Sequence, residues 1–306
     1  MEDVRDIEEQ GRNLVGIIPI AGHESFDFDQ PWPDCMMPIA PNYNLIEAAV
    51  VECAWAGCKS IWITVNHDFC KYIRKRLGDW CFDPVWSHRV FDRNIGESKR
   101  TIPIYYVGVN PKDRHKRDCT SWSVIHGALC AFKTLSNLSK YMIPSKYYVS
   151  FPHGYFPAYQ LREHRRIINS KQNCYISSQG TSVKDDNFMS FTFGKDEWLD
   201  FRRVIRTGTG ARVPGTKPID NMFLDPSEMW SARYFGVDKV FDPLDLNIAH
   251  EIKVENYFNL RSWEEYRDFM VASRSFSLKR PSKSILMGAR ANAVCSDYLE
   301  DDEGET

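Results

Sequence analysis

The sequence has no apolar run that approaches the roughly 18 residues of a membrane-spanning helix, so no membrane partner is expected. It also has no excess of basic charge: the formal net charge is −2, and binding of nucleic acid through phosphate neutralisation is not expected. Residues 1–12 are charged and contain no apolar stretch, which argues against a secretory signal.

Cysteine patterns that indicate disulfides or metal sites are missing too. The nine cysteines are odd in number and include no CxxC pair, which argues against a disulfide framework and a Cys-ligated zinc site. Several lie in apolar runs, where a free cysteine behaves as a small hydrophobic residue. This usage is typical of a reducing compartment, so we expect a cytoplasmic protein, or one in the host cytoplasm if the gene is viral.

Single catalytic signatures are also absent. The chain has no HExxH, EF-hand, Walker A or GxGxxG pattern and no nucleophile elbow. Function therefore has to be inferred from the order of several segments.

What the sequence does contain is an alternation of apolar strands and helical patterns. Its 306 residues are 43 % hydrophobic, which is enough for a large core. The pattern predicts four strand–helix units, with strands at 14–20, 61–65, 102–109 and 146–151 and helices at 45–56, 67–77, 122–135 and 158–169. Short β-type runs at 173–178 and 187–193 follow. We predict an α/β fold of three layers, with helices on both faces of a mainly parallel, mixed central sheet.

Local signals indicate where several elements begin and end. Asn44 and Ser121 are expected helix N-caps, and Gly57 is expected to end the first helix. Ser262 and Glu265 have the spacing of a capping box, while residues 79–100 are aromatic and are expected to be irregular. We divide the chain into a polar lead-in, one α/β domain and a C-terminal tail, at residues 1–12, 13–275 and 276–306.

Several ordered segments resemble the sugar-phosphate nucleotidyltransferases, which have the GT-A-like nucleotide-diphospho-sugar transferase fold. The resemblance covers most of residues 14–272 and rests on the order and spacing of its segments. In the first half of the chain, VGIIPIAG at 15–22 is similar to the family's first strand and turn, PDCMMPI at 33–39 is similar to its P-K-x-L-x-P segment, and residues 56–63 match its AG-x-x-x-I-x-I junction. TSWS at 120–123 is similar to the helix start that contacts the base. Residues 146–155 are similar to the strand that in the family ends in Gly-Asp, and NLRSWEEY at 259–266 is similar to D-x-G-T-P-E-D-Y.

The resemblance implies a ligand, a cofactor and a reaction. The ligand is a nucleotide or nucleotide-sugar bound over the carboxyl ends of the first, third and fourth strands, with a sugar phosphate as co-substrate. The cofactor is Mg²⁺, and the reaction is attack of the sugar phosphate on the α-phosphate with release of pyrophosphate. The implied substrate-binding residues are Ala21, Gly22, Thr120, Ser121 and Gly154.

Basic loops supply further candidates for binding the substrate. Arg114, Lys116 and Arg117 form a cluster that attracts phosphate, beside the turn expected to contact the base; the alternative is a solvated run of charges. Arg212 and Lys217 lie in a glycine-containing loop that is a candidate to close over an anionic substrate.

The chain departs from the family where phosphate and metal are held. The first loop, HESFDFD at 23–29, is acidic where the family has glycines and an arginine, and Asp34 replaces the family's lysine. The two metal-binding aspartates fall at 152–154 and at Asn259. Because phosphoryl transfer depends on positioning and on neutralisation of charge, these changes favour an alternative, a catalytically inactive binding protein that keeps the fold.

Four acidic or imidazole side chains remain candidates for chemistry. Asp27 and Asp29 are candidate Mg²⁺ ligands, against the alternative of an acidic, solvent-exposed loop. Their D-x-D spacing also leaves open a glycosyltransferase of the same general fold. His23 and His153 are candidate acid/base or binding groups, against the alternatives of a polar turn residue and a hydrogen-bonded structural histidine.

Overall fold

A mixed sheet of eight strands forms the centre of the computed structural model, which describes residues 13–22, 28, 30–87, 100–110, 113, 117, 119–210, 232, 235–276, 278–281 and 285–286. Across the sheet the strands are β11 (His250–Lys253), β9 (Cys174–Ser177), β10 (Phe191–Phe193), β7 (Lys146–Val149), β1 (Leu14–Pro19), β4 (Ser60–Val65), β6 (Thr101–Gly108) and β5 (Trp80–Phe82).

The central strands are parallel, as predicted. β1 pairs in parallel with β4 and β7, and β4 pairs in parallel with β6. β10 runs antiparallel to β7 and β9, and β5 runs antiparallel to β6, so the sheet is mixed. All six residues of β1 are buried, which explains why this strand reads as an unbroken apolar run.

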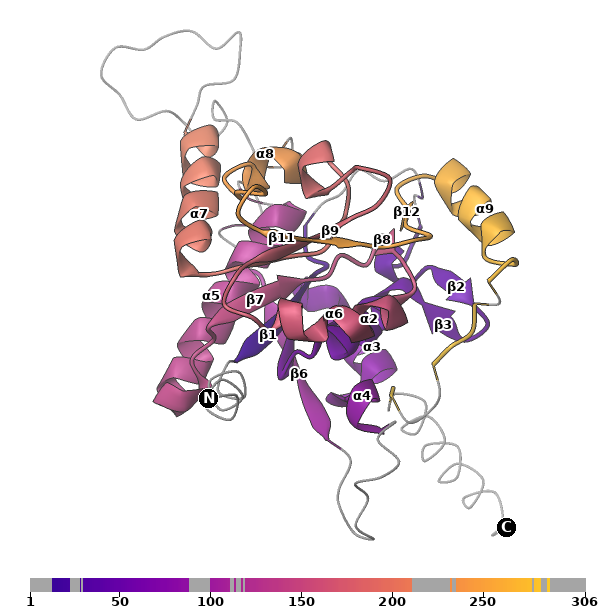
Figure 1. Cartoon of the computed structure of the whole chain (residues 1–306), viewed down its shortest axis with the longest axis horizontal. Helices are drawn as coiled ribbons and strands as arrows, with labels where there is room; N and C mark the ends of the chain where they lie inside the picture. Colours follow the sequence, from indigo (N-terminus) through magenta and orange to yellow (C-terminus); the bar gives the residue numbers. More distant parts are fainter. Residues whose placement is uncertain are drawn as a thin grey trace, which may run out of the picture.

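Helices cover both faces of the sheet (Figure 1). α2 (Leu45–Ala56), α3 (His67–Leu77) and α6 (Leu161–Ile168) lie over one face, and α5 (Thr120–Leu138), α7 (Lys195–Thr209) and α8 (Val237–Phe241) over the other. Successive residues of a strand point to opposite faces. Accordingly, Leu14 and Ile18 of β1 pack in the core under α2, while Val15 and Ile17 pack in the core under α5. The predicted three-layer α/β architecture is therefore confirmed.

Most of the expected caps are present. Asn44 accepts from the Glu47 amide and donates its own amide to the Glu47 carboxylate, both at 3.2 Å, and Gly57 ends α2 with a φ of 91°. Ser262 and Glu265 form the predicted capping box before α9 (Trp263–Ala272). The prediction that Ser121 caps α5 is wrong. Cys119 has the extended backbone of an N-cap, and its Sγ accepts from the Trp122 amide at 3.3 Å.

Part of the segment expected to be irregular is ordered. Residues 80–82 form β5 and residues 84–87 form α4 (Pro84–Ser87), so the expectation is wrong there. The reason is tertiary, because β5 gains its hydrogen bonds from β6 and from the C-terminal segment, where the Phe82 amide donates to the Ile285 carbonyl at 2.9 Å. The division into one domain and a tail stays a prediction, although residues 276–281 and 285–286 include side chains that pack on the core.

Two short pairs of strands complete the described fold. β8 (Gly154–Tyr155), just after β7, pairs with β12 (Phe258–Asn259) beside α9. β2 (Pro38–Ala40) pairs with β3 (Tyr43–Asn44) before α2. Short 3-10 turns occupy Asp34–Met36, Lys140–Met142, Ala158–Gln160 and Val183–Asp185. None of the described helices is both long enough and apolar enough to cross a membrane.

Candidate functional site

The turn after β1 packs directly against the start of α5. The amides of Ile20 and Ala21 both donate to the Thr64 carbonyl, at 2.9 and 2.8 Å, and the Ser123 hydroxyl donates to the Ala21 carbonyl. Gly22 has a φ of +128°, and a Cβ there would lie 2.8 Å from the Thr120 amide nitrogen. Glycine is therefore required by both conformation and space.

This contact brings together four of the predicted substrate-binding residues, Ala21, Gly22, Thr120 and Ser121. The Trp122 amide is taken by the Cys119 cap, whereas the amides of Thr120 and Ser121 precede the first hydrogen bonds of the helix and carry the positive end of its dipole. They therefore favour an anionic or hydrogen-bond-accepting group. The Ser121 side chain is 1 % exposed, and its hydroxyl has no hydrogen-bond partner among the described residues. The same holds for the indole nitrogen of Trp122. Buried polar atoms without a partner are rare and suggest a missing ligand or water.

One predicted basic residue lies beside this turn. The Arg117 guanidinium sits 4.6 Å from the centre of the Trp122 ring and forms an ion pair with Asp113 at 3.2 Å. The aromatic ring and the carboxylate hold the cation next to the start of α5. Arg114, Lys116, Arg212 and Lys217 are outside the described residues, and so are His23, Asp27 and Asp29.

His153 follows β7 at the same edge of the sheet. Its carbonyl accepts from the Leu260 amide at 2.7 Å, and its ring lies 6.0 Å from that of Phe188. Desolvation of the ring, with a contribution from the Arg261 guanidinium, lowers the pKa of His153 to about 3. The imidazole is therefore neutral near pH 7, and it does not supply a cation for phosphate binding.

Gly154 occupies a place where two backbones touch. A Cβ at Gly154 would lie 1.8 Å from the Phe188 carbonyl oxygen, so no other residue fits without a shift of the chain. Gly154 pairs with Asn259 across β8 and β12. The fold thus places Asn259 beside Gly154, the last residue of the segment 152–154, and at this segment and at Asn259 the resemblance expects the two metal-binding aspartates.

The side chains at these two positions do not fit Mg²⁺. Magnesium prefers carboxylate and water oxygens, whereas the chain offers an imidazole, a glycine and an amide. The Asn259 amide oxygen is already 3.4 Å from the Tyr257 hydroxyl and 3.5 Å from the Phe188 amide. Within the part of the chain that the structure describes, no group of three His, Cys, Asp or Glu side chains could hold a metal ion.

A buried carboxyl group behind this edge was not predicted. Glu52 of α2 is 4 % exposed and accepts hydrogen bonds from three hydroxyl groups, those of Tyr148 at 2.6 Å, Ser190 at 2.5 Å and Ser150 at 2.8 Å. Burial raises the pKa of Glu52 to about 7, against the opposing effect of the three hydroxyl groups. The available signal was a lone glutamate inside the apolar run VVECAWA. Because Ser150 directly follows β7, Glu52 ties α2 to the strand that leads to His153.

No protein-family model matches the chain. No curated protein matches it either. Its structure is similar to that of a glucose-1-phosphate thymidylyltransferase from Bacillus anthracis in complex with sucrose, with a TM-score of 0.55, 10 % identity and coverage of 89 % of this chain and 98 % of that chain. An apo UDP-glucose pyrophosphorylase covers 87 % of this chain and 100 % of its own, with a TM-score of 0.49 and 13 % identity. The first likeness shows the fold, which is the one that the sequence resemblance implies.

Proposed function

We propose that this chain, which has the fold of the sugar-phosphate nucleotidyltransferases, binds a nucleotide or a nucleotide-sugar between the turn after β1 and the start of α5. The observation that carries the proposal is the close contact of Gly22 with Thr120, beside a buried Ser121 hydroxyl that has no partner among the described residues. A base edge or a phosphate oxygen would satisfy that hydroxyl and the first amides of α5.

The charge around the turn supports this ligand. Arg117 is held beside Trp122, where it offers a cation to a phosphate. The predicted contributions of Arg114, Lys116, Arg212 and Lys217 would add to it, because several cations are needed to neutralise a polyphosphate. We place the protein in the cytoplasm, or in the host cytoplasm if the gene is viral, since the eight described cysteines are all free thiols.

The reaction that suits this fold is nucleotidyl transfer to a sugar phosphate. An oxygen of the sugar phosphate would attack the α-phosphorus of a nucleoside triphosphate, the bond to the bridging oxygen would break, and pyrophosphate would leave. Asp27 and Asp29 stay the predicted metal ligands for such chemistry, and His23 stays a predicted acid/base group. The D-x-D spacing of the two aspartates keeps a glycosyltransferase as a further prediction.

A second candidate function is binding without transfer. It is favoured by the pairing of Gly154 with Asn259, because both positions lack the carboxylates that the family uses for metal. A protein of this kind would recognise the nucleotide through α5 and the turn after β1 and would release it unchanged.

Binding and catalysis are tested in one set of measurements. Calorimetric titration with the nucleoside triphosphates and with UDP-sugars, with and without Mg²⁺ or Mn²⁺, should show saturable binding of at least one nucleotide. Ser121→Ala should weaken that binding by about tenfold through loss of one hydrogen bond in a buried site. Ser136→Ala, on the same helix but away from its start, should leave it unchanged.

Three outcomes separate the candidates. Binding that requires a divalent cation, together with pyrophosphate release when a sugar phosphate is added, supports transfer. Metal-independent binding without product supports the binding protein. Absence of binding by every nucleotide and UDP-sugar at millimolar concentration, in a sample that unfolds cooperatively, overturns both.

A further inference from the structure

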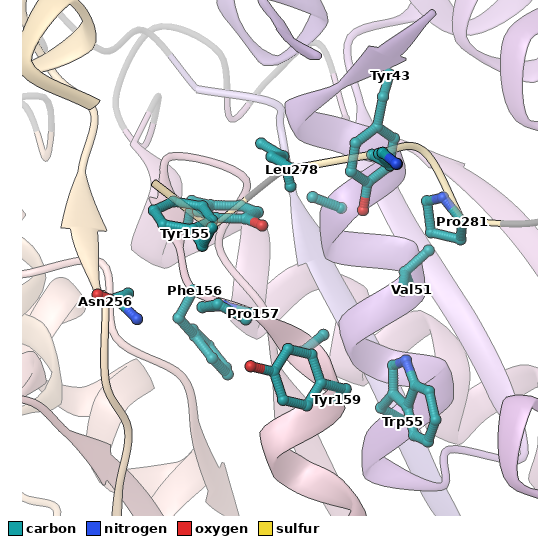
Figure 2. Close-up of a pocket in the computed structure, with 14 residues that line it drawn as sticks. Tyr43, Val51, Trp55, Tyr155, Phe156, Pro157, Tyr159, Asn256, Leu278 and Pro281 are labelled. Atoms are coloured by element: carbon teal, nitrogen blue, oxygen red, sulfur yellow. The ribbon is translucent and has the colours of Figure 1, made fainter. Parts of the chain in front are cut away.

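A pocket of ≈ 290 Å³ lies beside α2 (Figure 2). The nucleotide is proposed to bind at the start of α5, which covers the opposite face of the sheet. Its walls come from Tyr43 and α2, from residues 155–159, from Asn256, and from the C-terminal residues 276, 278, 279 and 281. Trp55, Tyr155 and Leu278 belong to the core under α2, whereas Cys119 and Trp122 at the start of α5 belong to the opposite core. The pocket is therefore a separate site.

Two sets of polar contacts brace the walls. The Gln160 side chain donates to the Glu255 carbonyl at 3.0 Å and accepts from the Glu255 amide at 2.9 Å, which fixes the loop that carries Asn256. The opposite wall is anchored by Arg280, whose guanidinium lies 2.7 Å from the Glu47 carboxylate, an acid that is 1 % exposed. Because these contacts hold the walls in place before a ligand binds, fewer side chains and loops have to be ordered on binding, and the entropic cost of binding is lower.

Aromatic rings with polar tips line the space. Figure 2 shows Tyr43 and Trp55 on the α2 side and Tyr155, Phe156 and Tyr159 on the other side. Tyr159 is 65 % exposed, so its ring is accessible to a ligand. Asn256 has a φ of 57°, a left-handed conformation that asparagine adopts more readily than other residues except glycine.

The charge of the lining narrows the ligand class. Among the described lining residues Lys279 is a cation and none is an acid, so a metal ion is an unfavourable ligand. The size is at the lower end for small-molecule pockets and suits one or two rings. A ligand with apolar C–H faces and hydroxyl edges matches this lining: its faces pack on aromatic rings, and its hydroxyls reach an amide, an ammonium and phenols.

We propose that this pocket binds a free saccharide of one or two rings, at a site independent of the nucleotide. Tyr159 stacks on a sugar face. The Asn256 side-chain amide accepts hydrogen bonds from sugar hydroxyls and donates to them, and the Lys279 ammonium donates to them. The site requires no nucleotidyl group, so it exists whether or not the proposed transfer occurs.

Ligand-observed NMR with the full chain tests this, using glucose, maltose and uridine as separate probes. Maltose or glucose should bind saturably in the millimolar range. Tyr159→Ala should weaken that binding by about tenfold because a stacking face is lost. Asn256→Gly, which keeps the left-handed backbone and removes the amide, should weaken it as well. Tyr72→Ala removes a similarly exposed tyrosine, 69 % exposed on α3, and should have no effect.

Contrary results are equally clear. If neither saccharide binds at concentrations of tens of millimolar, the dissociation constant is too high for a useful site and the proposal is overturned. So does binding that Tyr159→Ala leaves unchanged. If uridine binds and the saccharides do not, and if Tyr159→Ala abolishes the uridine binding, the pocket is a nucleoside site and the saccharide proposal is wrong. Ser121→Ala should not alter saccharide binding, so failure of the nucleotide site and failure of this pocket are distinguishable.

Discussion

Asn259 lies directly opposite Gly154 where β12 pairs with β8. The two residues are far apart in the chain, yet the fold brings them together at the edge of the sheet beside the end of β7. At these positions the sequence resemblance expects metal-binding aspartates, and the chain has a glycine and an asparagine instead. The described residues 153, 154 and 259 therefore contribute no carboxylate for a metal ion.

Gly154→Ala should destabilise the protein strongly. The added Cβ would lie 1.8 Å from the Phe188 carbonyl oxygen, so β8 must move from its neighbour, at a cost of about 3 kcal/mol or more. Urea denaturation measures the change in the free energy of unfolding. Gly108→Ala is the control, because a Cβ there meets nothing within 4 Å. Equal stabilities of the two variants would contradict the close backbone contact.

Stability should depend on pH through Glu52. Its pKa is raised from 4.5 to about 7 in the folded protein, so the folded state keeps a proton that the unfolded state releases. The favourable contribution is complete below pH 4.5 and is lost as pH rises to about 7, which amounts to about 3 kcal/mol at most.

Glu52→Gln should remove that dependence, since an amide does not titrate. The free energy of unfolding, measured with urea at several pH values between 4.5 and 8, should fall less steeply in the variant than in the wild type. Glu264→Gln, at a side chain that is 79 % exposed, is the control and should follow the wild type. Parallel curves for wild type and Glu52→Gln would show that Glu52 is not the titrating group.

Arg280→Ala should loosen the C-terminal segment. It removes one of two guanidinium groups from the buried Glu47 carboxylate and leaves Arg76 as the partner, at 2.7 Å. The expected loss is about 2 kcal/mol, less than for a carboxylate left with no cation. Hydrogen exchange should also accelerate at the Phe82 amide, which donates to the Ile285 carbonyl. Arg267→Ala, at an exposed ion pair, should change neither quantity; if it does, the effect is not specific to this segment.

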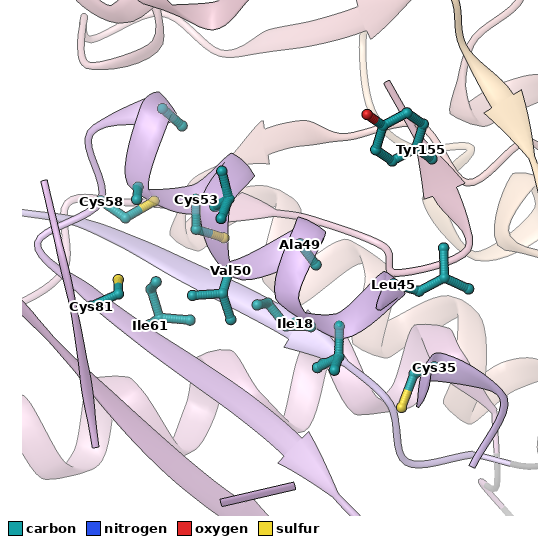
Figure 3. Close-up of a cluster of buried hydrophobic side chains, with 14 of the residues drawn as sticks. Ile18, Cys35, Leu45, Ala49, Val50, Cys53, Cys58, Ile61, Cys81 and Tyr155 are labelled. Atoms are coloured by element: carbon teal, nitrogen blue, oxygen red, sulfur yellow. The ribbon is translucent and has the colours of Figure 1, made fainter. Parts of the chain in front are cut away.

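The cysteines should differ sharply in reactivity. Cys53, Cys58 and Cys81 are buried together under α2, as Figure 3 shows, and burial raises the pKa of Cys53 and Cys81. A thiol reagent should therefore label Cys70 and Cys130, which are partly exposed, in the native protein. These three thiols, and the buried Cys35, Cys119 and Cys174, should react only on unfolding, as peptide mapping at increasing urea concentration would reveal. Native labelling of Cys53 would contradict this packing.

Elements with local determinants were predictable from the sequence. The apolar run of β1 and the capping box of Asn44 with Glu47 depend on neighbouring residues, and both are present. Ala21, Gly22, Thr120 and Ser121 were named as substrate-binding residues because of the resemblance, and that role stays a prediction. The structure places these residues together.

Other features depend on residues distant in the chain and were missed. β5 has three residues, too few for a periodic signal, and it exists because β6 and Ile285 supply hydrogen bonds. The cap of α5 is Cys119, a residue type that is not expected to cap, because the chain enters the helix two residues before Ser121, the predicted cap.

The sequence by itself therefore determined the βαβ frame, since strand burial and helix caps are encoded by adjacent side chains. Only the tertiary structure decided which side chains come together on that frame. It set Asn259 opposite Gly154, enclosed Glu52 among three hydroxyl groups, and built an aromatic pocket from four separate segments. The physical reason is that burial, desolvation and close backbone contact arise from packing between elements, and no local pattern in the chain records that packing.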